Sequence, residues 1–336
     1  MPDALDLLVE IGTEELPPKD LQRLAEAFKD EMSNGLKAAG LSHKGVIAYA
    51  TPRRLAVCVE DLLTRQPERK VERRGPAINK AFDDGGNPTR AAQGFASSCG
   101  VQIEQLDKLQ TEKGSWLVFR SVGGGKPTST LIAPMVGDAL GKLPTSRRMR
   151  WGHGEEQFVR PVQWVVILFG EEGIDAEILG LPTSTSTRGH RFHHPDPIRL
   201  QSARDYAKLL RDKGYVVADF QKRKQIIRES LQQAGVEAGG TTMIDEELLD
   251  EVTGMVEWPV PVIGAFDDEF LELPTRALIA TMQGHQRYFP VMDSGGDLLP
   301  RFVTIANINS TNPAAVQKGN ERVIRPRLKD AAFFYG

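Results

Sequence analysis

The fold is decided by the stretch FVRPVQWVVILF, residues 158–169. Its second half, from Trp164 to Phe169, is an almost continuous apolar run, which is typical of a β-strand covered on both faces. We therefore predict that this strand lies at the centre of a sheet. The run is far shorter than the ~20 residues that a helix needs to cross a bilayer, so no membrane association is expected.

Both strands and a helix are predicted before this strand. Residues 5–11 have strand character, and Pro17 and Pro18 suit the first turn of a helix because the missing amide donors cost little there. Short β-rich runs at 46–49 and 55–59 are separated by the turn TPRR. A helix between these strands is predicted by apolar positions at the spacing of one buried face, ended by Gly40: Leu21, Leu24, Phe28, Met32 and Leu36.

Later segments complete an α+β pattern. The sequence DSGGD separates two strand-like segments, 286–292 and 302–308, and predicts a tight hairpin. A chain of 336 residues exceeds the size of one ordinary core, so we expect several units with mixed sheets and packed helices. The predicted units are 1–63, an α/β start; 64–144, an inserted or mobile α+β element; 145–320, one or more α+β modules; and 321–336, the start of a truncated helical domain.

Composition restricts the class of protein. With 40% hydrophobic and 26% charged residues, the chain has the make-up of an ordinary globular protein. A net charge of -3 removes overall basicity as an argument for nucleic-acid binding. Cys58 and Cys99 are too few for a disulfide framework, and the N-terminus lacks the features of a secretory signal. These features predict a cytoplasmic location.

The usual catalytic motifs are absent or degraded. GGGK at 123–126 has Arg120 where a phosphate-binding loop requires glycine, and Pro127 where it requires Ser or Thr. His190, His193 and His194 could bind zinc if further ligands converged on them, but a loop that directs its ring nitrogens to a phosphate or a backbone group is favoured. We therefore assign no catalytic residue, no metal ligand and no cofactor to this chain.

Arginine-rich loops are the strongest functional signal. The planar guanidinium forms two hydrogen bonds to a phosphate, and adjacent aromatic residues offer stacking faces to unpaired bases. Internal ion pairing with the acidic runs of the chain is the competing explanation. The candidate RNA- or partner-binding residues are Arg53, Arg54, Arg147, Arg148, Arg150, Trp151, Arg188, His190, Arg191, His285, Arg287 and Tyr288.

A series of ordered motifs resembles a known family. The motifs span nearly the whole chain and run in this order: LLVEIGTEELPP at 7–18, TPRRLAV at 51–57, AFDDGGNPTRAAQGF, KGSWL, RMRWG, FVRPVQW, TRGHRF, LLDEVTGMVEWPV, HQRYF, ANINS and GNERVIRPRLKDAAFF. Together they resemble the N-terminal half of the β subunit of bacterial heterotetrameric glycyl-tRNA synthetase.

The resemblance implies an α2β2 class II synthetase in the cytoplasm that charges tRNA for glycine. ATP and Mg2+ would be used by the α subunit, whereas the β subunit would bind tRNA and assemble with α. It also implies a module similar to the B3/B4 region of the phenylalanyl-tRNA synthetase β subunit. Residues 321–336 would begin an HD-like domain, so we expect a truncated chain that is inactive alone.

Two alternatives remain open at this stage. The His-rich loop could belong to a metal-dependent hydrolytic or editing module, or the chain could be a purely structural scaffold.

One departure from the family pattern also matters for the fold, because Pro326 falls within RPRL and should bend or delay the final helix.

Overall fold

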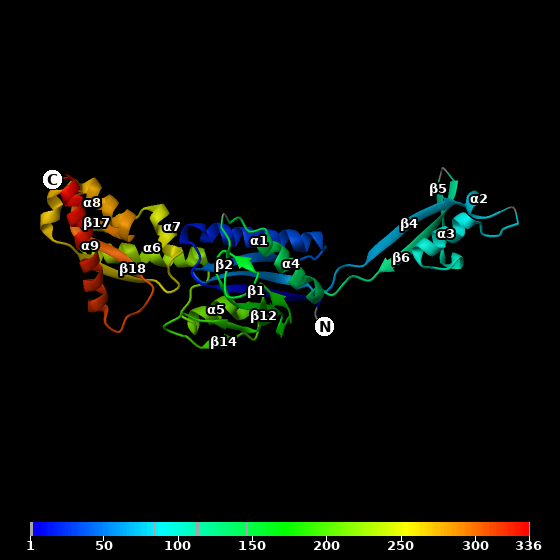
Figure 1. Cartoon of the computed structure of the whole chain (residues 1–336), viewed down its shortest axis with the longest axis horizontal. Coiled ribbons are helices and arrows are strands. Elements are labelled where there is room, and N and C mark those ends of the chain that lie inside the picture. The colour runs from blue at the N-terminus through cyan, green and yellow to red at the C-terminus, as the bar shows by residue number, and fades with distance from the viewer. Residues whose placement is uncertain (1–2, 84, 112–113, 146, 336) are drawn as a thin grey trace.

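The computed structural model describes residues 3–83, 85–111, 114–145 and 147–335. Its elements form three parts that follow one another along the long axis of the molecule (Figure 1). We call these parts the projecting module (69–123), the central unit (3–68 with 124–218) and the C-terminal unit (219–335). The mixture of several sheets with packed helices confirms the α+β class.

The apolar stretch forms β9 (Val162–Phe169), which lies inside a seven-stranded sheet as predicted. The other strands of this sheet are β1 (Ala4–Thr13), β2 (Gly45–Thr51), β3 (Arg54–Leu63), β10 (Glu172–Gly173), β11 (Glu177–Ile178) and β12 (Leu181–Ser184). Their order is β11-β12-β9-β1-β3-β2, with β10 also paired to β9. β1 is antiparallel to both β9 and β3, so the N-terminal strand is itself central.

Both faces of this sheet are covered. On one face lie α1 (Leu21–Ala38) and α4 (Ser129–Gly141), and the apolar positions predicted for the first helix are all buried there. The other face is covered by residues 185–218 (Figure 1). Elements of that layer are β13 (Ser186–Arg188), β14 (Pro197–Arg199) and α5 (Tyr206–Asp212).

The central sheet joins segments that the sequence divides between separate units. Residues 1–63 and 145–320 are expected from sequence to form different units, but β9 pairs with β1 along most of its length. Likewise α4, expected within 64–144, packs on α1. The cause is pairing between strands about 150 residues or more apart, which leaves no mark in the local pattern of either strand.

The projecting module is an insertion into the central unit (Figure 1). Its strands lie in the order β4-β6-β5, and Ala81, Ala92 and Leu117 form a small core. The return connection at 124–126 is irregular backbone, and the Gln66 amide donates to the Lys126 carbonyl at 3.0 Å. The elements are β4 (Arg69–Ala77), β5 (Asp107–Thr111), β6 (Gly114–Gly123), α2 (Ile78–Ala81) and α3 (Arg90–Cys99).

The C-terminal unit contains a four-stranded antiparallel sheet in the order β15-β17-β18-β16. The hairpin predicted at DSGGD is confirmed, since it connects β17 to β18. The strands are β15 (Thr241–Thr242), β16 (Val260–Ala265), β17 (Phe289–Met292) and β18 (Leu298–Ala306). The helices are α6 (Phe220–Glu237), α7 (Glu246–Thr253), α8 (Thr275–Thr281) and α9 (Pro313–Tyr335).

The final helix differs from its prediction. It begins at Pro313, well before residue 321, and continues through Pro326. The expectation that Pro326 delays the helix is therefore wrong. Ile324 and Leu328 on either side of the proline are fully buried, and this packing offsets the one backbone hydrogen bond that proline removes.

Short elements complete the chain. The strands β7 (Met149–Arg150) and β8 (Gln157–Phe158) pair with each other. Single 3-10 turns lie at Pro18–Asp20, Ile103–Gln105, Ala203–Asp205 and Asp268–Glu272, and a π-helical turn lies at Met282–Gln286. Among the residues described, no helix combines the length and apolarity that a membrane crossing requires.

Candidate functional site

A buried arginine lies at one end of the central sheet. Arg54 begins β3, is paired in register with Gly12 of β1, and is fully buried. Gly12 is in turn opposite Trp164 of β9. Side chains directly opposite one another in antiparallel strands share a face, so the arginine and the indole project from the same side. A fully buried charge is rare unless it is paired, and the partners of Arg54 define this site.

Every nitrogen of the Arg54 guanidinium has an acceptor. Nε donates to Thr51 Oγ1 at 3.1 Å, and Nη1 donates to Thr187 Oγ1 at 3.3 Å. Nη2 donates to the Arg188 carbonyl at 2.9 Å and to Glu257 Oε1 at 3.3 Å. Burial by itself lowers the pKa of this guanidinium, but Glu257, Glu10 and Tyr206 raise it above its ordinary value. Arg54 is thus a charged internal group with no face toward solvent.

Two buried carboxylates complete the arrangement. Glu10 of β1 lies 3.8 Å from Arg54 and accepts hydrogen bonds from the Thr187 hydroxyl and from Trp164 Nε1. Glu257 follows α7 and accepts from the Thr51 hydroxyl at 2.7 Å. We call Glu10, Arg54, Thr187 and Glu257 the arginine junction. Because Glu257 comes from the C-terminal unit and Glu10 from the sheet, the junction connects the two units.

A second buried arginine strengthens the same connection. Arg223 of α6 donates from Nη2 to the Ala50 carbonyl at 2.8 Å and from Nε to the Thr253 carbonyl at 3.1 Å. Its burial lowers the pKa of the guanidinium to about 10. Asn307, which follows β18, holds Glu257 in place within the C-terminal unit, since its Oδ1 accepts from the Glu257 amide at 2.7 Å.

Arginines that reach the surface surround Trp164. The guanidinium carbons of Arg53 and Arg188 lie 5.6 and 5.2 Å from the centre of its ring. Arg53 is half-buried in the β2–β3 turn, whereas Arg188 is exposed at the end of β13. Arg191 follows nearby along the chain and pairs with Glu14 at 2.9 Å. The structure therefore brings three of the candidate residues, with Arg54 beneath them, to one end of the sheet.

The histidine loop is held by backbone groups. His190 is buried, its Nε2 lies 2.7 Å from the Asn307 carbonyl oxygen, and its Nδ1 accepts from the amides of Phe192 and His193. Burial lowers the pKa of His190. His193 Nε2 accepts from the Asn309 amide at 3.0 Å. These contacts occupy both ring nitrogens of His190 and one of His193, and no group of three or more possible metal-binding side chains is found among the residues described.

The loop at RRMRWG divides into inward and outward side chains. Arg148 Nη2 donates to the Leu140 and Gly141 carbonyls, which lie in the last turn of α4. Trp151 packs against the core below α1 and α4. Arg147 and Arg150 are exposed, and Arg150 pairs only with the exposed Glu155 at 3.2 Å among the residues described. Two of these four candidates therefore stabilise the fold, and two face solvent.

The HQRYF segment is mainly structural. Tyr288 is buried, stacks on Phe302, and donates from its hydroxyl to Asn320 Oδ1 at 2.9 Å. Arg287 pairs with Glu251 of α7 at 2.9 Å. His285 is exposed and lies apart from the arginines around Trp164, on the C-terminal unit. The structure does not bring this segment together with the RRMRWG loop.

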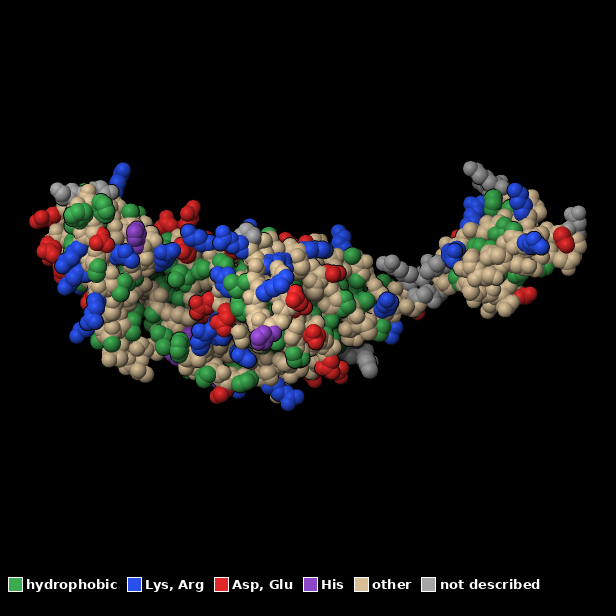
Figure 2. Space-filling model, viewed as in Figure 1, with side chains coloured by type: hydrophobic (Ala, Val, Ile, Leu, Met, Phe, Trp, Pro, Cys, Tyr) green, Lys and Arg blue, Asp and Glu red, His purple; other side chains and the backbone are tan. Residues whose placement is uncertain are grey.

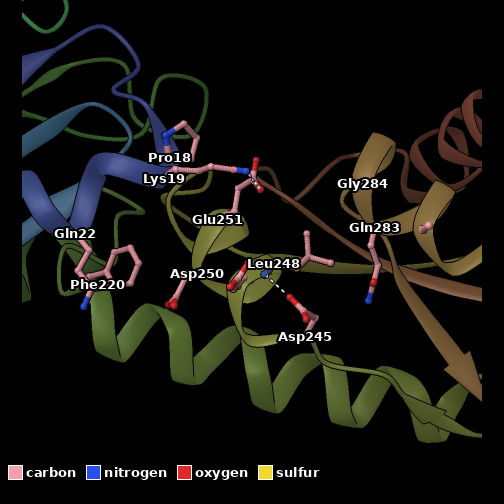
Figure 3. Close-up of a pocket in the computed structure, with 12 residues that line it drawn as sticks. Pro18, Lys19, Gln22, Phe220, Asp245, Leu248, Asp250, Glu251, Gln283 and Gly284 are labelled. Carbon is pink, nitrogen blue, oxygen red and sulfur yellow. Dashed lines mark hydrogen bonds and ion pairs between the residues drawn. The ribbon is translucent and has the colours of Figure 1, made fainter. Parts of the chain in front are cut away.

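A cavity of about 600 Å³ lies between the start of α1, α7 and the turn after α8 (Figure 3). Several carboxylates line it, but most already have partners. Asp250 pairs with Lys224 at 2.6 Å, and Glu251 pairs with Arg287. Asp245 accepts from the Leu248 amide at 2.8 Å and so caps α7 (Figure 3). The negative lining disfavours an anionic nucleotide.

The surface charge is mixed. Figure 2 shows Lys and Arg side chains interspersed with Asp and Glu side chains over the visible face of the central and C-terminal units. An RNA contact on this face would therefore depend on small groups of arginines and not on one broad basic field.

Sequence reasoning missed the acids of the junction. Glu10 interrupts the apolar run LLVEIG, and an acid within a strand that is otherwise buried is a signal for a buried ion pair. Thr187 and Glu257 have no comparable local signal, because their role depends on contacts across the fold.

Residues 7–336 match the glycyl-tRNA synthetase beta subunit family. The chain belongs to this family. It is 52% identical over 330 residues to the glycine-tRNA ligase beta subunit of Hahella chejuensis and 51% identical over 331 residues to that of Marinobacter nauticus. Each comparison covers 98% of this chain and 48% of the relative, so the chain spans about half the length of these curated relatives. In this member of the glycyl-tRNA synthetase beta subunit family, the arginine junction and the arginines around Trp164 form the candidate site.

Proposed function

We propose that this chain provides tRNA-contacting and subunit-contacting surfaces of a glycine-tRNA ligase. The observation that carries the proposal is a division among the candidate arginines. Arg54 and Arg148 satisfy internal acceptors, whereas Arg147, Arg150 and Arg188 direct their charge to solvent. Exposed pairs such as Arg150 with Glu155 are worth little, so these side chains are available to phosphate.

The remaining family expectations belong to the same proposal. The partners would be the α subunit and tRNA for glycine, and ATP and Mg2+ would act at the α subunit in the cytoplasm. The chain alone would not charge tRNA. A likeness of one of its α+β modules to the B3/B4 region of phenylalanyl-tRNA synthetase also stays a prediction.

The test uses the full-length β subunit assembled with α. Arg147 and Arg150 are both changed to Gln, and the affinity for tRNA is measured by fluorescence anisotropy over a series of salt concentrations. We expect the negative slope of log K against log salt to become shallower, its magnitude decreasing by about one for each phosphate that the variant no longer binds. Arg211→Gln is the matched control, because Arg211 is an exposed arginine on α5 that pairs with Asp212.

Unchanged tRNA affinity and an unchanged salt slope in the Arg147 and Arg150 variant would contradict an RNA role for this loop. A purely structural role is the second candidate, and the arginine junction favours it because its buried charges hold two units together. Normal tRNA binding after neutralisation of all the exposed candidate arginines would support the structural role instead. The editing alternative is not favoured, since backbone groups occupy the nitrogens of His190.

A further inference from the structure

We infer that Arg53 and Arg188, set over Trp164, together hold one phosphate group of the tRNA backbone. We call these three residues the phosphate clamp. The inference rests on the proposed function and narrows it to one site. Its first support is the position of both guanidinium carbons, 5.6 and 5.2 Å from the centre of the same indole ring.

The two arginines must approach the indole from one side. Gly12 lies opposite Trp164 in the sheet, and a Cβ at residue 12 would overlap the ring, so the ring lies directly on the Gly12 backbone. The strand blocks the inner face of the ring and leaves only the outer face and the edges. Arg53 and Arg188 therefore approach the ring at its outer face or edges, the parts of the indole that the strand leaves open.

The charge of these two arginines is not neutralised within the described part of the chain. The carboxylates nearby are already engaged: Arg54 holds Glu10 and Glu257, and Arg191 holds Glu14. Neither Arg53 nor Arg188 has a carboxylate within ion-pairing distance among the residues described, and Arg53 Nε is buried without a hydrogen-bond partner. Four arginines (Arg53, Arg54, Arg188 and Arg191) thus face three carboxylates here, and the net positive charge that remains favours an anion.

The electrostatic environment of Arg53 supports this conclusion. Burial is the main cause that lowers the pKa of its guanidinium; Glu257 and Glu14 raise it in part, and the neighbouring Arg191 and Arg54 lower it further, so the net shift is downward. A bound anion would stabilise the charged form. Guanidinium groups bind phosphate oxygens through paired hydrogen bonds, and phosphate contacts fix the position of a nucleic acid without reading its sequence.

The clamp is also held in place before any ligand arrives. Trp164 Nε1 donates to Glu10, which fixes the ring, and the Arg188 carbonyl accepts from Arg54 at 2.9 Å, which fixes the backbone at the end of β13. An arginine fork that is already positioned loses less side-chain entropy on binding. The arginine junction therefore supports the clamp from below.

The test is a double-mutant cycle on the full-length β subunit assembled with α. Arg53→Gln, Arg188→Gln and the double variant are compared for tRNA affinity at several salt concentrations. If both side chains hold one phosphate, each single change raises the Kd about tenfold and the double change raises it little further. The magnitude of the slope of log K against log salt then decreases by about one in all three variants.

Other outcomes would overturn the inference. Unchanged affinity, or additive losses with a slope lower by about two in the double variant, would show no shared phosphate. Inorganic phosphate at constant ionic strength serves as a second probe. Displacement of tRNA from the parent protein but not from the double variant would support the inference, because both phosphates would compete for the same two arginines. Phosphate binding that needs both arginines but displaces no tRNA would overturn it and assign the site to a free anion.

Two sets of controls distinguish a failure of the clamp from a loss of folding and from a failure of the broader proposal. Arg53 is half-buried, so its replacement could disturb folding; the melting temperatures of Arg53→Lys and of Arg188→Gln, which changes an exposed residue, are therefore measured together with their tRNA affinities. Arg211→Gln controls for the change in net charge. The Arg147 and Arg150 variant is measured in parallel. If that variant loses affinity and the clamp variants do not, the clamp alone is wrong. If no variant loses affinity, the proposed tRNA role fails as well.

Discussion

Replacing Arg54 by Met should destabilise the protein far more than any surface substitution. The change leaves Glu10 and Glu257 buried, since the side chains are 0% and 2% exposed, without the cation that lies 3.8 and 3.3 Å from them. Removing one partner of a buried ion pair typically costs about 3–5 kcal/mol, because the remaining charge is uncompensated. Met fills a similar volume, so little of the loss would come from a cavity.

Urea unfolding followed by tryptophan fluorescence measures this loss, because Trp164 hydrogen-bonds to Glu10 within the junction. We expect the free energy of unfolding of Arg54→Met to fall by about 3–5 kcal/mol with an unchanged m value. Arg211→Met, at an exposed site, should change it by no more than about 0.5 kcal/mol.

A combined variant tests the cause. With Glu10→Gln and Glu257→Gln added to Arg54→Met, no charge remains buried in the junction, and a large part of the stability should return. The reasoning would be refuted if Arg54→Met stayed within about 1 kcal/mol of the parent. It would also be refuted if the triple variant were as unstable as Arg54→Met alone.

Two further changes test neighbouring contacts. Arg204→Gln removes the hydrogen bond that chiefly lowers the pKa of Asp6 below 3.8. A lowered carboxyl pKa stabilises the fold above 3.8 and stops doing so as the pH falls through the folded value. Because Arg204 is 71% exposed, the variant should be only slightly less stable than the parent at pH 7, and the difference should shrink as the pH falls below 3.8, as thermal melts at several pH values would show. Gly12→Ala should cost about 1–3 kcal/mol because its Cβ would overlap the Trp164 ring; an unchanged melting temperature would contradict that placement.

Local patterns predicted the elements of this fold well. The apolar run at 164–169, the spacing of apolar residues in α1 and the DSGGD hairpin each depend on neighbouring residues, and each is found in the structure. The pairing of β9 with β1 was not predictable in this way. It depends on contacts between residues about 150 positions or more apart, for which the sequence of either strand gives no register.

The roles of single residues in the candidate site were also not predictable from local sequence. TPRR presents two adjacent arginines that are chemically equal in the sequence. In the structure Arg54 starts β3 and faces the buried side of the sheet, while Arg53 remains in the turn. Their different roles depend on the acids that the fold brings to Arg54, and only Glu10 has a local signal.

The junction and the clamp are parts of one physical arrangement. Arg54 binds Glu257 through Nη2 and, through the same nitrogen, the carbonyl of Arg188. The backbone that carries one arm of the clamp is therefore fixed by the contact that joins the C-terminal unit to the sheet. Because Arg54 engages the buried carboxylates, Arg53 and Arg188 have no acid to pair with in the part of the chain that the structure describes. Because the three carboxylates at this end of the sheet pair with Arg54 and Arg191, Arg53 and Arg188 form no ion pair within the described residues and can contact an external anion.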